Sequence, residues 1–372
     1  MSKKILFCVL FILIFLIPSK QDPNAKTWLP GSKIPADSIA RALIRGECVN
    51  IDSCLIYNPL IMGGTMEKID TIKGEVNIRN SVFLQEVLIA WSHFLKQVRL
   101  VDNSFRSVFL CNGNIFNDWV IIARDSFSDM AAISQNTFGG IASFEESIFD
   151  SLVLFAQNLF RKEWNFRETR FKQKVDFTLS EFETIRITWK QLDGHLIFYP
   201  PLFSKLLQCL EQQRQLDDAD EIYLFLKDHE RIEKPKVQRY LEYWFIQQTC
   251  GYGVKPSRTL IVCALVIILF SVFYTKSNAI REIQKEFGHR RRRRGYRIVR
   301  KRFRRRVSDA LYFSVQTFII GVVPAWQPTD EFLINTKRIR LFKFRTLAMI
   351  EGALGWILLV LFVVTLTRKF IR

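Results

Sequence analysis

Residues that could carry out chemistry are few in this chain, and their spacing matches no catalytic pattern. The four histidines, His93, His195, His229 and His289, are scattered and form no nucleophilic triad or metal-ligand motif with other residues. The seven cysteines include no CxxC pair. We therefore expect no enzyme activity, no catalytic residue, no metal site and no cofactor.

Basic residues are concentrated in one segment, 276–307, which carries +13 of the net charge of +18. Because Lys and Arg that flank membrane segments stay on the cytoplasmic side, this segment is predicted to be a cytoplasmic loop. It could also bind anionic lipid head groups, at about 1 kcal/mol per basic residue, or nucleic acid. Topology plus contact with membrane lipids is the favoured interpretation, and no nucleic-acid partner is expected. The residues assigned to this role are Arg290, Arg291, Arg292, Arg293, Arg294, Arg304, Arg305 and Arg306.

Two features of the C-terminal region could act on ions. Glu351 is the one carboxylate inside the apolar stretch 347–366. Intramembrane carboxylates usually face protein or water, but near the end of a span Glu351 could also extend to the surface. Segment 308–324 is apolar but too short to span a bilayer, which is typical of a re-entrant helix.

Other apolar segments predict how the chain, with Glu351 and segment 308–324, is inserted in a membrane. In residues 1–20, Lys3 and Lys4 precede an apolar run, which predicts a signal peptide or, since no clear cleavage site follows, a signal anchor. Segments 256–275 and 346–367 are predicted transmembrane helices. We expect a multi-pass protein of the cell membrane whose N-terminal half lies outside the cytoplasm. If so, Cys48 and Cys54 could form a disulfide, and two buried thiols are about equally expected.

An eleven-residue repeat is the strongest pattern in the sequence. Phe recurs ten times at this spacing, and a small polar residue stands two positions before each Phe. A second row of apolar residues lies six positions after the Phe row, and both rows are expected to point inward. Pairs of apolar residues separated by one position are typical of strands, whereas rows five and six apart form no single stripe on a helix. The Phe positions are 83, 94, 105, 116, 127, 138, 149, 160, 171 and 182.

This repeat resembles the pentapeptide-repeat family, whose members form a right-handed quadrilateral β-solenoid. The Phe-rich version with alternating five- and six-residue steps matches residues 70–184. The chain departs from the family where Ser, Asn, Asp or Val replaces the usual inward Ala, so polar side chains should be hydrogen-bonded inside. Residues 21–69 are expected to form an N-terminal cap. The solenoid would bind a protein partner or serve as a rigid spacer, and its net charge of −3 over 70–183 disfavours imitation of DNA.

Leu and other apolar residues at three- and four-residue spacing predict a helical connector over 196–252. The order span, short apolar segment, span then resembles two-transmembrane potassium channels. Segment 309–318 looks like a pore helix, but the sequence after Thr317, Phe-Ile-Ile-Gly-Val-Val-Pro, is not the family's filter. The motif Gly251-Tyr252-Gly253 could be read as a substitute filter, but it precedes the first span rather than following a pore helix, so a hinge is the favoured interpretation.

The channel resemblance implies a homo-oligomer, by analogy a tetramer, that passes ions of unspecified kind. Gly352 and Gly355 would let helices approach closely, which supports oligomer packing. The alternative is a membrane-anchored interaction or scaffold protein without transport activity. The fold expected is therefore multidomain: a β-solenoid, an α-helical connector and an α-helical transmembrane region. The pore-lining residues implied are Thr317, Gly321, Val322, Val323 and Glu351.

Overall fold

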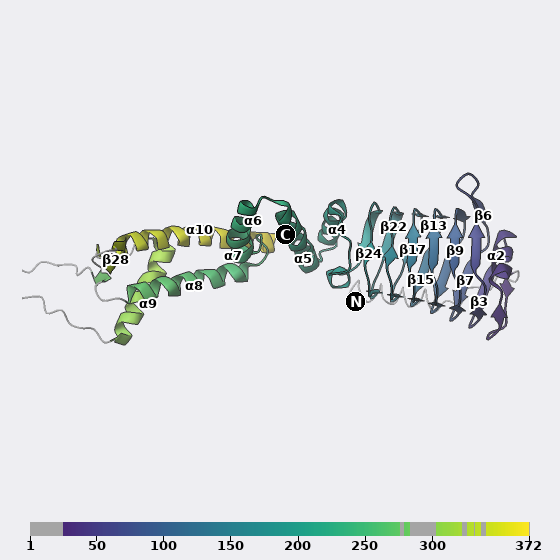
Figure 1. The fold of residues 1–372 in the computed structure, drawn as a ribbon, viewed down its shortest axis with the longest axis horizontal. Helices are drawn as coiled ribbons and strands as arrows, with labels where there is room; N and C mark the ends of the chain where they lie inside the picture. Colours follow the sequence, from purple (N-terminus) through teal and green to yellow (C-terminus); the bar gives the residue numbers. More distant parts are fainter. Residues whose placement is uncertain are drawn as a thin grey trace, which may run out of the picture. The chain divides into compact units, whose positions relative to one another are not determined.

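The computed structural model describes residues 25–275, 279–282, 303–321, 326–330, 332–335 and 340–371. The chain forms two compact units that meet in sequence at Tyr223 and Leu224. The first contains a parallel β-solenoid over residues 26–186, and the second is mainly α-helical (Figure 1). The predicted fold class is thus confirmed.

Each coil of the solenoid takes 22 residues, or two of the eleven-residue units, and contributes a short strand to each of four columns. Column 1 contains β1 (Lys26–Thr27), β3 (Val49–Asp52), β7 (Val76–Arg79), β11 (Val98–Val101), β15 (Val120–Ala123) and β19 (Ala142–Ser143). Column 2 contains β2 (Lys33–Ile34), β4 (Leu55–Ile56), β8 (Val82–Phe83), β12 (Ser104–Phe105), β16 (Ser126–Phe127), β20 (Ile148–Phe149) and β23 (Arg170–Phe171).

The other two columns complete the coil. Column 3 contains β5 (Leu60–Gly63), β9 (Val87–Ala90), β13 (Phe109–Asn112), β17 (Ala131–Ser134), β21 (Val153–Leu154) and β24 (Val175–Asp176). Column 4 contains β6 (Asp70–Ile72), β10 (Ser92–Phe94), β14 (Ile115–Phe116) and β18 (Thr137–Phe138). The longer strand β22 (Leu159–Asn165) pairs with β18 of column 4 and with β19 of column 1, so these two columns form one sheet. Strand β25 (Glu181–Arg186) pairs with β22.

The solenoid begins earlier than the repeat predicts. Residues 21–69, the expected cap, contain strands β1 to β5, which pair in the same columns. The partners of β3, β4 and β5 lie 27 residues on rather than 22, as in Val49 with Val76, because the loop between β5 and β6 adds five residues. Helix α2 (Ala36–Ile44) buries Ile39 and Leu43 at this end of the core.

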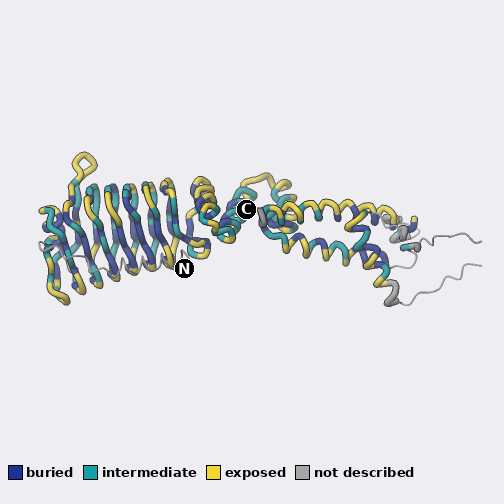
Figure 2. Tube along the Cα trace, turned by 180° about the vertical axis from the view of Figure 1, so that it is seen from behind, coloured by how far each residue is buried: buried dark blue, intermediate teal, exposed yellow. Residues whose placement is uncertain are grey.

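Stacked Phe rings fill the solenoid, and Figure 2 shows buried positions recurring along every coil. Phe105 and Phe127 stack with ring centroids 4.8 Å apart, and Phe138 and Phe160 with centroids 4.6 Å apart. One coil cannot bury its own rings, so neighbouring coils supply the rest of the core. Offset aromatic pairs of this kind add stability beyond the area that they bury.

The small polar residue of each repeat points inward and joins a hydrogen-bonded ladder. Asn136 Oδ1 accepts from the Asn114 N–H at 2.9 Å, and Asn136 Nδ2 donates to the Cys111 carbonyl at 2.7 Å. The residue before each ladder position has a left-handed backbone, and most of these residues are not glycine. The predicted internal hydrogen bonding is therefore present.

Helices complete the first unit and form the second. The helices are α3 (Trp189–Leu192), α4 (Pro200–Gln212), α5 (Leu216–Glu233), α6 (Lys236–Glu242), the π-helical turn η1 (Tyr243–Gln247), α7 (Gln248–Cys250), α8 (Pro256–Tyr274), α9 (Phe303–Ile320) and α10 (Phe344–Ile371). Two short antiparallel strand pairs are β26 (Ile280–Glu282) with β27 (Trp326–Pro328), and β28 (Phe332–Asn335) with β29 (Arg340–Lys343).

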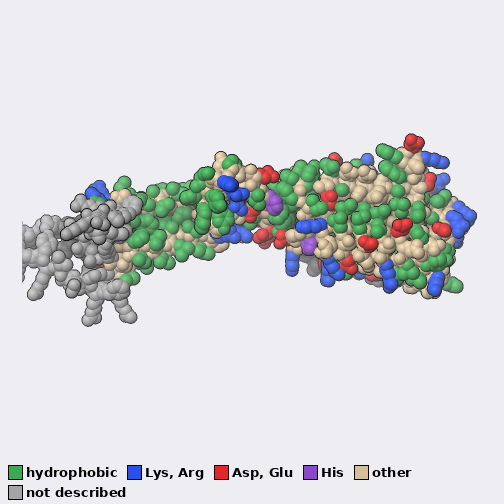
Figure 3. Space-filling model, in the orientation of Figure 1, with side chains coloured by type: hydrophobic (Ala, Val, Ile, Leu, Met, Phe, Trp, Pro, Cys, Tyr) green, Lys and Arg blue, Asp and Glu red, His purple; other side chains and the backbone are tan. Residues whose placement is uncertain are grey.

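Two of the described helices, α8 and α10, are long and apolar enough to cross a membrane. Their most apolar windows have mean hydropathies of 2.2 and 2.4. Figure 3 shows hydrophobic side chains covering this part of the second unit. Many large apolar side chains on α8 and α10 are exposed; Leu265 on α8 and Ile357 on α10, for example, are each more than half exposed. Soluble proteins rarely expose apolar patches of this extent.

Candidate functional site

The candidate site is the junction of α8, α9 and α10, three helices that contact one another. Phe313 of α9 packs on Tyr274, near the end of α8, while Phe318 packs on Cys263, near the middle of α8. Helix α9 therefore runs antiparallel to α8. Leu358, near the middle of α10, belongs to the same cluster as Phe318. The last turn of α9 thus lies beside the middle of both long helices.

The chain returns to the end of the bundle from which α9 starts. Strand β27, which follows α9, pairs with β26, which follows α8. The Thr329 N–H, just after β27, donates to the Ala279 carbonyl at 3.1 Å. The backbone therefore enters the bundle along α9 and comes back on the same side.

Glu351 lies inside the junction and has no exposed surface. The Tyr274 hydroxyl of α8 donates to Glu351 Oε2 at 2.9 Å, and Ser314 Oγ of α9 hydrogen-bonds with Oε1. Ser314 Oγ also lies 2.9 Å from the Ile267 carbonyl oxygen. The described side chains provide no ion pair for Glu351. In a single chain this carboxyl group therefore contacts protein and does not extend to the surface.

Thr317 and Gly321 lie at the end of α9. Thr317 is buried, and its hydroxyl has no hydrogen-bond partner among the described residues. The Gly321 N–H donates to the Thr317 carbonyl at 2.9 Å, and Gly321 ends the helix with a left-handed backbone (φ 77°) that glycine adopts without strain. The end of α9 therefore carries, beside a glycine turn, a hydroxyl that bonds to no described residue.

Glycines of α10 allow it to approach α9 closely. A Cβ atom at Gly355 would lie 2.1 Å from the Phe318 carbonyl oxygen, and one at Gly352 would lie 3.4 Å from Gly321 Cα. These glycines were expected to support packing between chains. In the structure they make the close contact within one chain.

The remaining predicted site residues are only partly described. Val322 and Val323 lie outside the described residues, as do the arginines at 290–294. The backbone of Arg304, Arg305 and Arg306 forms the first turns of α9, but their side chains lie outside the description. The structure thus brings together Thr317, Gly321 and Glu351. Sequence reasoning missed the partners of Glu351, Ser314 and Tyr274, whose hydroxyls carry no distinguishing sequence signal.

The motif Gly251-Tyr252-Gly253 forms a tight turn before α8. All three residues have left-handed backbones, with φ of 53°, 53° and 82°. Arg368 Nη1, near the end of α10, donates to the Tyr252 carbonyl at 3.2 Å. The motif therefore connects the start of α8 with the end of α10, away from the last turn of α9.

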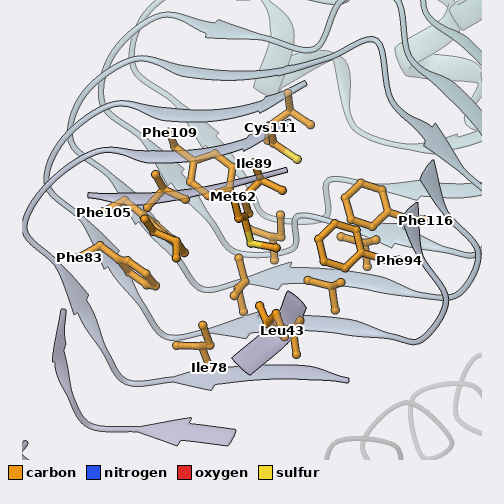
Figure 4. Close-up of a pocket in the computed structure, with 18 of the residues that line it drawn as sticks. Leu43, Met62, Ile78, Phe83, Ile89, Phe94, Phe105, Phe109, Cys111 and Phe116 are labelled. Atoms are coloured by element: carbon orange, nitrogen blue, oxygen red, sulfur yellow. The ribbon is translucent and has the colours of Figure 1, made fainter. Parts of the chain in front are cut away.

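The solenoid holds an apolar cavity of about 40 Å³ toward its N-terminal end, into which Met62, Phe94 and Cys111 point (Figure 4). The cavity lies where the second apolar row, six positions after the Phe row, has no aromatic residue; from Phe144 onward that row is aromatic and fills the interior.

No disulfide joins Cys48 and Cys54, both of which the structure describes. Within the described ranges, no group of three or more His, Cys, Asp or Glu residues is placed to hold a metal ion.

Comparisons of the chain with protein-family models, with curated proteins and with solved structures found no match. Fold and site together define a parallel β-solenoid followed by a helical unit with two helices that could cross a membrane.

Proposed function

We propose that the chain is a multi-pass membrane protein whose oligomers pass cations through a pore lined partly by the end of α9. The observation that carries this proposal is the path of α9, which enters the apolar bundle, ends beside the middle of α8 and α10, and returns on the same side. Non-spanning helices buried in protein are how membrane proteins place polar backbone at mid-depth.

The direction of α9 favours cations. The last carbonyl groups of a helix lack intrahelical donors, and the aligned peptide dipoles give that end a partial negative charge. In α9 this end lies beside the middle of α8 and α10, next to the Thr317 hydroxyl, which has no hydrogen-bond partner among the described residues. Helix ends of this polarity stabilise cations in known channels and transporters.

In this proposal α8 and α10 span the cell membrane, the basic segment 276–307 is cytoplasmic and contacts anionic lipid, and the solenoid is outside. The resemblance to two-transmembrane channels supports a tetramer. Exposed apolar side chains along α8 and α10 supply the surface that faces lipid or a neighbouring subunit.

Ion currents from the purified protein in planar bilayers test the proposal. We expect cation currents that fall at least tenfold on Thr317→Val or Gly321→Ala, because both changes alter the polar end of α9. Ser128→Ala, on an exposed position of the solenoid, is the control and should leave the currents unchanged. Silent bilayers across several ionic conditions would overturn the proposal.

The second candidate function is a membrane-anchored scaffold, and one surface favours it. Outward-facing residues of column 3 form an apolar stripe, because they lie in register on neighbouring coils: Ile61, Leu88, Leu110 and Leu154, with the buried Ala132 between the last two. Ile61 is 57% exposed. If the solenoid docks a protein here, Leu88→Glu with Leu110→Glu should abolish cross-linking to that protein in native membranes while the bilayers stay silent.

A further inference from the structure

We infer that Glu351 is a proton-binding site: a neutral carboxylic acid in a hydrogen-bonded chain that runs from Tyr274 through Glu351 and Ser314 to the Ile267 carbonyl. The chain links all three helices, since Tyr274 and Ile267 belong to α8, Ser314 to α9 and Glu351 to α10. This inference depends on the packing of the bundle and stands whether or not the protein conducts ions.

Counting hydrogens gives the direction of each bond. Ser314 has a single hydroxyl hydrogen but lies within hydrogen-bond distance of two oxygens, Glu351 Oε1 and the Ile267 carbonyl. The carbonyl oxygen can only accept. When Ser314 donates to the carbonyl, Oε1 must supply the hydrogen for the second bond. Tyr274 donates to Oε2, which leaves Oε1 as the oxygen that carries the proton.

The surroundings also disfavour a charged carboxylate. Glu351 is fully buried, and no cationic side chain among the described residues contacts it. Burying an ionised carboxylate without a counter-ion is far more costly than burying a neutral acid with its hydrogen bonds satisfied. Tyr274 is the titratable group that contacts it; the others with described side chains on these helices are Arg258, Cys263, Asp309, Tyr312, Arg345 and Arg368.

The proton therefore helps to seat α9. With the proton present, each side-chain oxygen of Tyr274, Glu351 and Ser314 in this hydrogen-bonded chain has a partner. Without it, two acceptors compete for the Ser314 hydrogen, and a negative charge lies between three apolar helices. Proton release should loosen the contact of Ser314 with Glu351, which is the polar link between α9 and α10 at this junction.

Infrared spectroscopy of the full chain in lipid nanodiscs tests the site. The wild-type spectrum minus that of Glu351→Gln should show the carbonyl stretch of a protonated acid at neutral pH. Gln keeps both hydrogen bonds, because its amide donates to Ser314 and accepts from Tyr274. Glu233→Gln is the control: Glu233 is exposed on α5, outside the junction of the three helices, so the band assigned to Glu351 should be absent from its difference spectrum. Carboxylate bands from Glu351 at neutral pH would overturn the inference.

A second variant keeps Glu351 and covers the case in which Glu351→Gln does not fold. Ser314→Ala removes the acceptor for the Oε1 hydrogen, so the acid carbonyl stretch should shift to that of a more weakly hydrogen-bonded acid. An acid band that is identical in wild type and Ser314→Ala would show that the proton is not held by Ser314 and would reject the proposed chain.

Discussion

Asp125 occupies a position in the solenoid ladder where the neighbouring residues donate a hydrogen bond. Asn103 donates to the carbonyl of Ile78, and Ser147 donates to that of Ile122, in both cases 25 residues earlier. The equivalent carbonyl for Asp125 belongs to Leu100. Asp125 Oδ1 accepts from the Asn103 N–H at 2.5 Å, while Oδ2 is buried without a hydrogen-bond partner among the described residues. A protonated Oδ2 would complete the pattern.

Burial raises the pKa of Asp125 well above its usual value of 3.8, because the charged form loses its hydration. The folded state therefore binds the proton more tightly than the unfolded state, so stability is fully present below pH 3.8 and is lost as the pH rises toward the folded pKa. Asp125→Asn keeps the donor without a charge. The free energy of unfolding of Asp125→Asn should exceed that of the wild type, and the difference should grow by about 1.4 kcal/mol per pH unit within that window.

Denaturant unfolding of the wild type and Asp125→Asn between pH 4 and 8 measures this difference. Asp129→Asn is the matched control, because Asp129 is exposed in the same coil and should show no growing advantage. If Asp125→Asn were less stable than the wild type at pH 7, the ladder would hold a carboxylate and the interpretation would be wrong.

At the scale of elements, the stacked Phe columns hold neighbouring coils together. Phe127 is 1% exposed and stacks between Phe105 and Phe149 at 4.8 and 4.7 Å. Phe127→Ala should destabilise the protein by about 3–5 kcal/mol, because the cavity cannot collapse between two fixed coils. Thermal or denaturant unfolding measures it, with the exposed Ser128→Ala as control. A loss below 1 kcal/mol would mean that the coils relax independently.

The contact between α9 and α10 depends on Gly355. Any side chain there meets the Phe318 backbone carbonyl, which cannot move aside as a flexible side chain would. Gly355→Leu should therefore displace α9 and lower the melting temperature in detergent, at a cost of at least about 1–3 kcal/mol. Ala353→Leu, two residues away on the exposed face of α10, should have little effect. Equal melting temperatures for the two variants would contradict this packing.

These elements were predictable to different degrees, for physical reasons. The invariant Phe spacing indicated the solenoid because each coil repeats one local pattern. The strands before β6 were not predicted from the repeat, because the loop before β6 shifts the register of their pairing by five residues. The left-handed turns occupied by Asn80, Trp91 and Gln135 carry no glycine signal. The partners of Glu351 come from two other helices, and a carboxylate alone does not identify them.

At the scale of the whole molecule, charge and apolar length argue for one arrangement across a membrane. Segment 276–307 follows α8 and leads into α9, so α9 should enter the membrane from the side that holds the basic residues. The basic segment is predicted to be cytoplasmic, and the solenoid, on the other side of α8 in the sequence, is then outside.

Labelling of single cysteines with an impermeant thiol reagent on intact cells tests this orientation. We expect Ser128→Cys in the solenoid to react, and His289→Cys in the basic segment to react only after the membrane is permeabilised. Five of the native cysteines are buried, so replacing Cys8 and Cys48 by Ser should give a low background. The opposite labelling would place the solenoid in the cytoplasm and make α9 enter from outside. The packing of α9 against α8 and α10 would be the same in either case, so this experiment decides from which side of the membrane α9 enters.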